Sequence, residues 1–247
     1  MIKLLRSWQE LEDARSWLQG RRIDFTLSSK ARIWRLLFAL RFRKAPPPAD
    51  KLKSWDVTNM VQLIEQLTPD RSTPILDLGC FNSEILWGLR DLGYADLHGC
   101  DLNPLCKWMP YWTSVHYKVS DMTRTDYNAR RFRVLTAVSA IEHGVPIAAL
   151  AREASRLLQA GGLFLVTTDY DGTGASHDTS AELIFGQNWT IFSRPALQAV
   201  IDEFRANGLE LLSEVAEADW NHEARPVSWN GQDYTFALLV FRRTQEN

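Results

Sequence analysis

The sequence predicts a doubly wound α/β fold, with a seven-stranded, mostly parallel sheet, helices on both of its faces and an antiparallel last strand. Two observations support this prediction. Short apolar segments alternate with segments of helical spacing about 10–15 residues long, an order typical of parallel strands joined by crossover helices. Strands expected at 209–216 and 234–242 leave no room for a helix between them. Since parallel neighbours need such a crossover, the last strand is expected to be antiparallel.

Each element has its own signal in the sequence. Val57, Val61 and Ile64 recur at helical spacing after Ser54, a residue type that can cap a helix. Further helices are expected at 83–92, 147–158 and 193–207, and glycines stand at or near their ends. The remaining strands are expected at 74–79, 96–101, 115–121, 133–139 and 163–168.

Composition and charge limit the class of protein. The 247 residues fit one large domain, and their net charge of -2 does not indicate a nucleic-acid binder. The three cysteines, Cys80, Cys100 and Cys106, have no CxxC spacing, so neither a disulfide framework nor a zinc site is expected. The sequence shows no signal peptide and no apolar run of membrane-spanning length. A cytoplasmic protein is therefore expected.

The first 50 residues differ in composition from the rest of the chain. Residues 1–45 contain eleven Lys or Arg against four Asp or Glu, and a run of three prolines follows at 46–48. Such a charged segment set off by prolines is typical of an appendage. Residues 1–50 are therefore interpreted as a basic helical N-terminal extension, and residues 51–247 as the main domain.

A cofactor loop is expected where the first predicted strand of the sheet meets its helix, at 77–83. Gly79 lets the backbone approach a ligand closely, and the next helix presents free N–H groups. Asp101 stands 24 positions after Asp77, at the end of the next strand, where a carboxylate can accept hydrogen bonds from both ribose hydroxyls. This pattern predicts a site for an adenosine cofactor.

The loop's glycine content separates two kinds of cofactor. A nicotinamide or flavin site holds a pyrophosphate and normally uses three glycines in G-x-G-x-x-G. This loop has one, and Phe81 and Ser83 stand where further glycines are expected. S-adenosylmethionine has no phosphate and carries a sulfonium cation, which suits the acidic Asp77. The loop therefore favours S-adenosylmethionine.

The sequence resembles the class I S-adenosylmethionine-dependent methyltransferases in five segments, in that family's order and spacing: PILDLGC (74–80), HGCDLNP (98–104), SDM (120–122), SAIEH (139–143) and LLQAGGLFLVTTD (157–169). The resemblance covers roughly residues 55–242. It implies a Rossmann-like sheet, S-adenosyl-L-methionine as cofactor and a methyltransferase domain at 51–247. The family's loop usually reads D-x-G-x-G-x-G, so Phe81 and Ser83 depart from it, and the usual loop shape does not carry over directly.

The resemblance also implies roles for particular residues. Asp77 and Gly79 flank the methionine part of the cofactor, Asp101 holds the ribose, and Asp121 with Met122 lies at the adenine. The cofactor-binding residues implied in this way are Asp77, Gly79, Cys80, Phe81, Asp101, Leu102, Asp121, Met122 and Ser139.

Candidate catalytic groups follow the fourth and fifth predicted strands of the parallel sheet. They are Glu142, His143 and Asp169. An oxygen acceptor benefits from a base, and a neutral imidazole near pH 7 favours His143 in that role. The alternative is that Glu142 and His143 only order a turn. Some relatives bind a metal near this point, but Ser139 replaces one expected ligand, so no metal is predicted. His177 is expected to be exposed to solvent.

The acceptor is expected to be a small molecule, anionic or sugar-containing, and not a nucleic acid. The segment 169–194 is long for a loop and contains Tyr170, Phe185, Trp189 and Phe192, which fits a substrate wall. Residues 185–204 resemble bacterial methyltransferases of glycan and secondary-metabolite pathways. This favours O-methylation of a sugar or glycan precursor.

Two other functions stay open. One is N-methylation of protein or nucleic acid, which is disfavoured because SAIEH replaces the usual Asp/Asn-Pro-Pro-aromatic signature. The other is an inactive cofactor-binding interaction module.

Residues 30–44 form the most unusual part of the extension. Apolar and basic residues interleave there, and as a helix the segment would be amphipathic. Three interpretations are open: a cap helix packed over the cofactor, a collector of anionic substrate, and a peripheral contact with a membrane surface or a partner.

Overall fold

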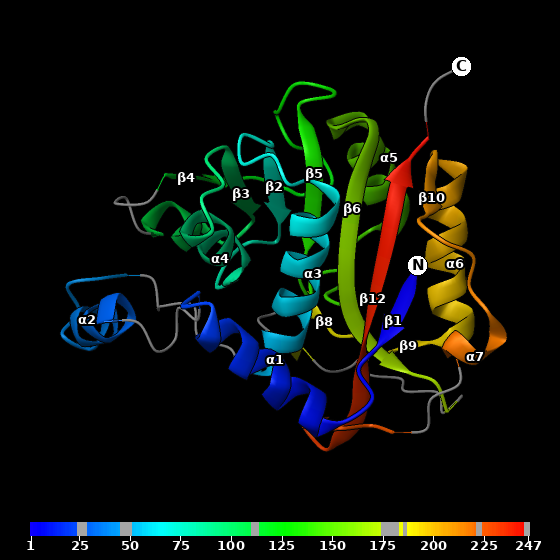
Figure 1. Cartoon of the computed structure of the whole chain (residues 1–247), viewed down its shortest axis with the longest axis horizontal. Coiled ribbons are helices and arrows are strands. Elements are labelled where there is room, and N and C mark those ends of the chain that lie inside the picture. The colour runs from blue at the N-terminus through cyan, green and yellow to red at the C-terminus, as the bar shows by residue number, and fades with distance from the viewer. Residues whose placement is uncertain are drawn as a thin grey trace.

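The computed structural model describes residues 1–23, 29–44, 51–109, 114–173, 183–184, 187–220 and 224–244. Its centre is a sheet in the strand order β1-β12-β6-β5-β2-β3-β4 (Figure 1). The parallel strands are β2 (Ile75–Leu78), β3 (Leu97–Asp101), β4 (Val115–Val119), β5 (Phe132–Ala137) and β6 (Leu158–Asp171). Strand β12 (Gln232–Arg243) runs antiparallel to β6. The predicted fold class is confirmed.

The free edge of β12 carries two short strands. Strand β10 (Leu209–Leu211) pairs with its end, and β1 (Ile2–Leu4) pairs with residues 237–239. The helical extension predicted from the sequence therefore begins with a strand of the central sheet. Three residues are too short for an alternating pattern to be recognised. The other short strands are β7 (Leu183–Ile184), β8 (Gln187–Asn188), β9 (Phe192–Ser193) and β11 (Val227–Trp229).

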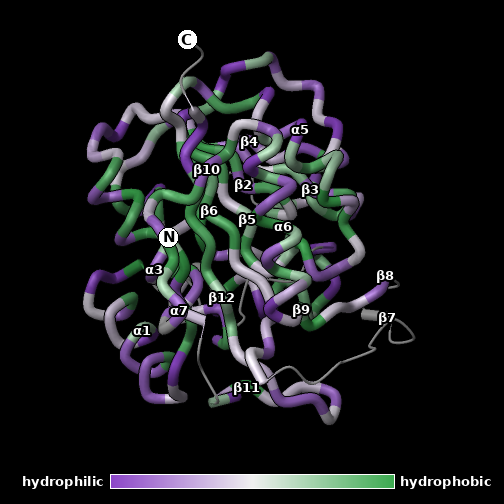
Figure 2. The backbone as a smooth tube through the Cα atoms, turned by 90° about the vertical axis from the view of Figure 1, so that its right-hand side faces the viewer, coloured by the Kyte–Doolittle hydropathy of each residue, from purple (hydrophilic) through white to green (hydrophobic). Residues whose placement is uncertain are grey.

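Helices cover both faces of the sheet, as Figure 2 shows from the side. One face is covered by α1 (Trp8–Gly20), α3 (Ser54–Leu67) and α4 (Ile85–Asp91), and the other by α5 (Ile147–Leu157) and α6 (Arg194–Ala206). The remaining helical segments are α2 (Ser29–Ala39), α7 (Glu217–Trp220) and the 3-10 turns η2 (Lys51–Lys53) and η3 (Pro104–Trp108). Among the described residues no helix is both long and apolar enough to cross a bilayer.

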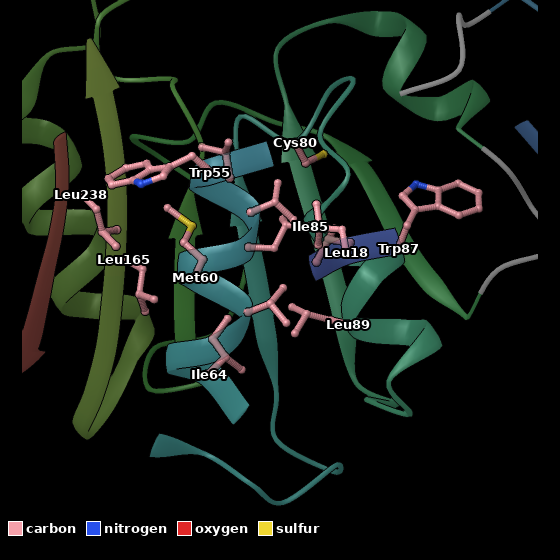
Figure 3. Packing of buried hydrophobic residues seen from close by; sticks show 14 of the residues in the cluster. Leu18, Trp55, Met60, Ile64, Cys80, Ile85, Trp87, Leu89, Leu165 and Leu238 are labelled. Carbon is pink, nitrogen blue, oxygen red and sulfur yellow. The ribbon is translucent and has the colours of Figure 1, made fainter. Parts of the chain in front are cut away.

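Each face of the sheet has its own hydrophobic core. On the α3 side, Met60 and Ile64 of α3 lie between Leu165 of β6 and Leu89 of α4 (Figure 3). On the other side, Phe164 packs edge-on against Phe204 of α6, with ring centroids 5.5 Å apart. Because successive strand residues point to opposite faces, this alternation also decides which polar side chains meet at the strand ends.

Candidate active site

The carboxyl ends of the parallel strands, which point downwards in Figure 1, bring the predicted site residues together. Asp77 follows Ile75 on the α3 face, and Asp169 follows Leu165 on the same face at even spacing. Both carboxyl groups are buried. The start of α3 lies over this edge, since Lys53 contacts Ser139 and Asp169. The site is therefore an edge of the sheet covered by one helix end.

The loop after β2 requires glycine at one position. Gly79 has a φ of +76°, and a Cβ built there would lie 2.8 Å from Ala140 Cβ and 4.0 Å from Met122 Sδ. A side chain at this position would be strained by the backbone angle and would collide with Ala140. The loops after β2, β4 and β5 thus meet at Gly79, which brings the predicted adenine residue Met122 to the cofactor loop.

Asp101 at the end of β3 holds the loop in place. Its Oδ2 accepts a hydrogen bond from the backbone N–H of Phe81 at 3.0 Å, and its Oδ1 accepts one from Asn103 at 2.7 Å. The loop also donates from the N–H groups of Gly79 and Cys80 to the carbonyl of Cys100. A carboxylate bound by two amides is fixed in orientation and keeps further lone pairs for ribose hydroxyls.

Asp77 is a buried carboxyl group suited to a cation. Thr136 donates a hydrogen bond to its Oδ1 at 2.7 Å, while Oδ2 is buried and accepts no close hydrogen bond from the described residues. Burial raises the pKa of Asp77 to about 7, against the opposing effect of the Thr136 and Ser83 side chains. A positive group placed at Oδ2 would favour the carboxylate. The residues present therefore fit the cationic methionine end of S-adenosylmethionine.

The other predicted cofactor residues lie in different surroundings. Cys80 is buried, with its Sγ 3.5 Å from Cys106 Sγ, and Phe81 is half-buried. Leu102 is 57% exposed, which leaves it available to a ligand. Asp121 is exposed, and its Oδ1 accepts hydrogen bonds from the N–H and hydroxyl of Thr123. Each of these assignments to cofactor binding stays a prediction.

A second polar cluster, at the ends of β5 and β6, contains the predicted catalytic groups. Ser139 has a φ of +44° and accepts a hydrogen bond from Lys53 Nζ at 2.6 Å. Asp169 Oδ2 accepts one from Trp189 Nε1 at 2.8 Å, and its Oδ1 lies 3.7 Å from Lys53 Nζ. Glu142 Oε2 accepts one from Thr168 at 3.1 Å. The structure thus brings Ser139, Glu142 and Asp169 into one cluster.

Burial shifts the proton affinities of this cluster. The pKa of Glu142 is raised to about 8, first by burial and then by the charge of Asp169. The pKa of His143 is lowered by burial, against the opposing charge of Asp169. Near neutral pH, Glu142 therefore holds its proton and His143 is an uncharged imidazole. A protonated Glu142 can donate a hydrogen bond, and an uncharged His143 can accept a proton as a general base.

Lys53 and Asp56 also belong to this cluster, but no sequence motif marks them. Lys53 and Asp56 flank the first turn of α3, and Lys53 also lies 4.1 Å from the ring centroid of Phe236. Asp56 is fully buried, and burial raises its pKa to about 7, partly offset by Lys53. The position of Asp56 among the apolar residues of its helix is the only sign in the sequence that this carboxyl group is buried.

The aromatic residues of 169–194 separate into two groups. Trp189 is buried beside Asp169 and packs edge-on against Tyr234. Tyr170 and Phe192 belong to the core on the α5 and α6 side, and the ring centroids of Tyr170 and Trp220 are 6.2 Å apart. Of the aromatic residues on which the substrate wall was predicted, Trp189 is the one described at the polar cluster. His177 and Phe185 lie outside the described residues.

Among the residues that the structure describes, no three His, Cys, Asp or Glu side chains form a metal-binding group.

Fold and site together define the class of protein: a Rossmann-like domain with a cofactor loop after β2 and an acid at the end of β3. The family model described as a methyltransferase domain matches residues 76–166, from β2 into β6. Over residues 76–166 the chain therefore carries a methyltransferase domain, and its cofactor loop and buried Asp77 fit S-adenosylmethionine as the cofactor. No curated protein matches the sequence at a significant level.

Solved structures share the fold at low sequence identity. Geranyl diphosphate C-methyltransferase from Streptomyces coelicolor A3(2), solved with S-adenosyl-L-homocysteine, is 16% identical with a TM-score of 0.60, over 78% of this chain and 80% of that one. The [4+2]-cyclase SpnF is 15% identical with a TM-score of 0.57, over 87% and 94%. Haemonchus contortus phosphoethanolamine N-methyltransferase 2 is 13% identical with a TM-score of 0.54, over 76% and 52%. These likenesses show the fold, not the acceptor.

Replacing Asp101 by alanine is expected to weaken cofactor binding by about 1–3 kcal/mol, because hydrogen bonds to a charged group are lost and the Phe81 loop is released. Calorimetric titration with S-adenosylhomocysteine measures the change. Asp126→Ala is the control, since Asp126 is an exposed carboxylate that pairs with Lys118. Unchanged affinity in Asp101→Ala would show that the cofactor is held elsewhere.

Replacing Asp56 by asparagine is expected to stabilise the protein as the pH rises. The folded pKa of about 7 exceeds the ordinary value of 3.8 for an aspartate, so between these pH values the folded chain holds a proton that the unfolded chain has released. Wild-type stability therefore falls as pH rises through this window, and the variant escapes the loss. Thermal unfolding at about pH 4 and about pH 8 should give a difference near zero and then about 1–3 kcal/mol. The exposed Asp233→Asn serves as control; a difference independent of pH would contradict the assignment.

Proposed function

We propose that this methyltransferase transfers a methyl group to an oxygen of a small-molecule acceptor, a sugar or glycan precursor. One observation carries the proposal: a neutral His143 stands with Asp169, Glu142 and Lys53 in a polar cluster beside the cofactor loop. A hydroxyl group needs a base when it attacks, whereas a base of this kind is dispensable for a carbon nucleophile already rich in electrons.

The residues have distinct proposed roles. When bound, S-adenosylmethionine supplies an electrophilic methyl group on a sulfonium sulfur. Asp101 binds the ribose and orients the loop, and the Asp77 carboxylate compensates positive charge. With the cofactor bound, His143 would take the proton of the acceptor hydroxyl as this oxygen receives the methyl group. Most of the acceleration comes from alignment of these groups in a line.

The surroundings of the cluster support a small acceptor. Glu142 and Asp169 are almost entirely buried, so a macromolecular surface would reach them only through a narrow projecting group. The indole N–H of Trp189 donates a hydrogen bond to Asp169, and Lys53 places a positive charge next to the Asp169 carboxylate. A hydroxylated acceptor with an anionic group matches the cation and the base of this cluster. A cytoplasmic location belongs to this proposal; the three cysteines are free thiols, which is consistent with it.

A methyl-transfer screen tests the proposal. The protein and S-adenosylmethionine with a labelled methyl group are incubated with sugar nucleotides, oligosaccharides, small amines, protein and RNA. Label on a sugar oxygen is the expected result. Label on nitrogen, on carbon or on a macromolecule would overturn the O-methyltransferase assignment; C- and N-methyltransferases are both found among the structural neighbours. Cofactor binding without transfer to any acceptor would favour the interaction module.

A further inference from the structure

Exposed apolar side chains gather on one short segment. Nine large hydrophobic residues are exposed among those the structure describes, and five of them lie between residues 33 and 42. These five are Ile33 (58% exposed), Leu36 (59%), Phe38 (40%), Leu40 (56%) and Phe42 (78%). Single exposed apolar residues need no explanation, but a contiguous group of this kind marks a contact surface.

Helix α2 is attached to the domain by one side and presents the other. Ala31 and Trp34 are fully buried, and the Trp34 ring lies 5.8 Å from that of Trp87 in α4. Ile33, Leu36 and Leu40 are spaced three and four residues apart, and the Leu40 N–H still bonds to the Leu36 carbonyl. They therefore share one face of the helix, directed away from the Trp34 contact. We call this surface the α2 face.

The charged residues within the segment 29–44 are all basic. Arg32, Arg35, Arg41, Arg43 and Lys44 accompany the apolar residues, and residues 29–44 contain no Asp or Glu. The whole chain has a net charge of -2, so this concentration of positive charge is local. An apolar face bordered by arginines, in a segment that itself contains no acid, is complementary to a surface that is apolar inside and anionic outside.

We propose that the α2 face binds the surface of an anionic lipid membrane, with Ile33, Leu36 and Leu40 inserted between lipids and the arginines at the phosphates. An exposed aliphatic face of this kind needs an apolar medium more than a shaped pocket, and a membrane supplies one without shape complementarity. A folded protein partner would instead have to match both the apolar face and every nearby arginine. The proposal goes beyond methyl transfer and does not depend on the acceptor.

The attachment of α2 puts this membrane contact next to the cofactor site. Trp87 belongs to the helix that follows the cofactor loop, and Lys44 lies 4.6 Å from the ring centroid of Trp108, in the η3 turn that follows Asp101. In Figure 1, α2 lies on the lower side of the molecule, the side to which the parallel strands point. Docking through the α2 face would hold this edge of the sheet near the lipid headgroups.

Vesicle sedimentation of the full chain tests the proposal. Wild-type protein should sediment with vesicles of phosphatidylcholine containing phosphatidylglycerol, and much less with pure phosphatidylcholine or at high salt. Leu36→Ser/Leu40→Ser and Arg32→Glu should each weaken partitioning by at least about tenfold. Matched controls are Trp229→Ser, which removes an exposed indole elsewhere, and Arg152→Glu on the exposed side of α5; both should bind like wild type.

Folding and self-association are checked with the same variants. Each should keep the wild-type melting temperature and its affinity for S-adenosylhomocysteine, so that lost sedimentation reports the surface itself. Absence of wild-type sedimentation with anionic vesicles would overturn the proposal, as would equal binding by the α2 variants. A wild-type dimer that becomes monomeric in Leu36→Ser/Leu40→Ser, without vesicle binding by either, would assign the face to a second copy of the chain.

Discussion

Replacement of Gly79 by alanine is expected to abolish measurable cofactor binding and to lower the free energy of unfolding by roughly 2–5 kcal/mol. Two costs combine at this position. The φ of +76° is unfavourable for any residue with a Cβ, and the added methyl group would lie 2.8 Å from Ala140 Cβ. The loop can relieve the collision only by moving away from the turn after β5. That movement would displace the backbone from the place where it meets the cofactor.

Gly231 provides a closely matched control. Its φ is +77°, and an added Cβ would meet no atom within 4 Å. Gly231→Ala should therefore show the backbone cost alone, about 1–2 kcal/mol, with normal binding of S-adenosylhomocysteine. Thermal unfolding and calorimetry on both variants separate the two contributions. Equal losses of stability and retained binding in Gly79→Ala would mean that close contact between the two loops is unimportant for the cofactor.

Replacement of His143 by alanine is expected to reduce turnover by about 10²–10⁴-fold, the usual contribution of a general base. Cofactor affinity should stay close to that of wild type, because the cofactor loop is held by Asp101. The wild-type rate should fall as the pH drops through the lowered pKa of His143, since the imidazole then gains a proton. This acid limb should be absent from the variant. Initial rates across pH with the acceptor found in the methyl-transfer screen provide the measurement.

His116 supplies the comparison for His143. It is an exposed imidazole on β4 that stacks on His98, with ring centroids 5.0 Å apart. His116→Ala should leave turnover and its pH dependence unchanged. Wild-type rates in His143→Ala would reassign His143 to the turn that follows β5, the alternative that the sequence left open.

The sheet could be predicted from the sequence because its signal is local. Each of the seven expected strands is present, since apolar runs bounded by turn residues report burial directly. The cofactor loop was predictable for a similar reason: Gly79 and Asp101 each follow a strand in the sequence. The hydrogen bond from the Phe81 N–H to Asp101 was not predictable, because it joins the end of β3 to the loop after β2, 20 positions away.

The polar cluster around Lys53 shows what sequence reasoning could not reach. Lys53 meets Ser139 across 86 positions of the chain, and nothing near Lys53 in the sequence indicates that contact. The strand character of Ile2–Leu4 was hidden for another reason. Three residues give too short a pattern, and their pairing depends on β12. Contacts of this kind depend on how helix α3 packs against the sheet and how the first residues of the chain pair with β12, and neither is encoded in a local sequence pattern.

The pairing of β1 with β12 has a kinetic consequence. Leu5 and Thr235, bonded at the end of this ladder, are 230 residues apart along the chain. Closing so long a loop is costly in chain entropy, and contacts of such separation form late in folding. Until then the edge of β12 offers unpaired backbone groups to any passing strand, including one from another nascent chain. The short first strand thus protects this edge against misassembly once it has paired, and its removal is expected to lower the yield of soluble protein.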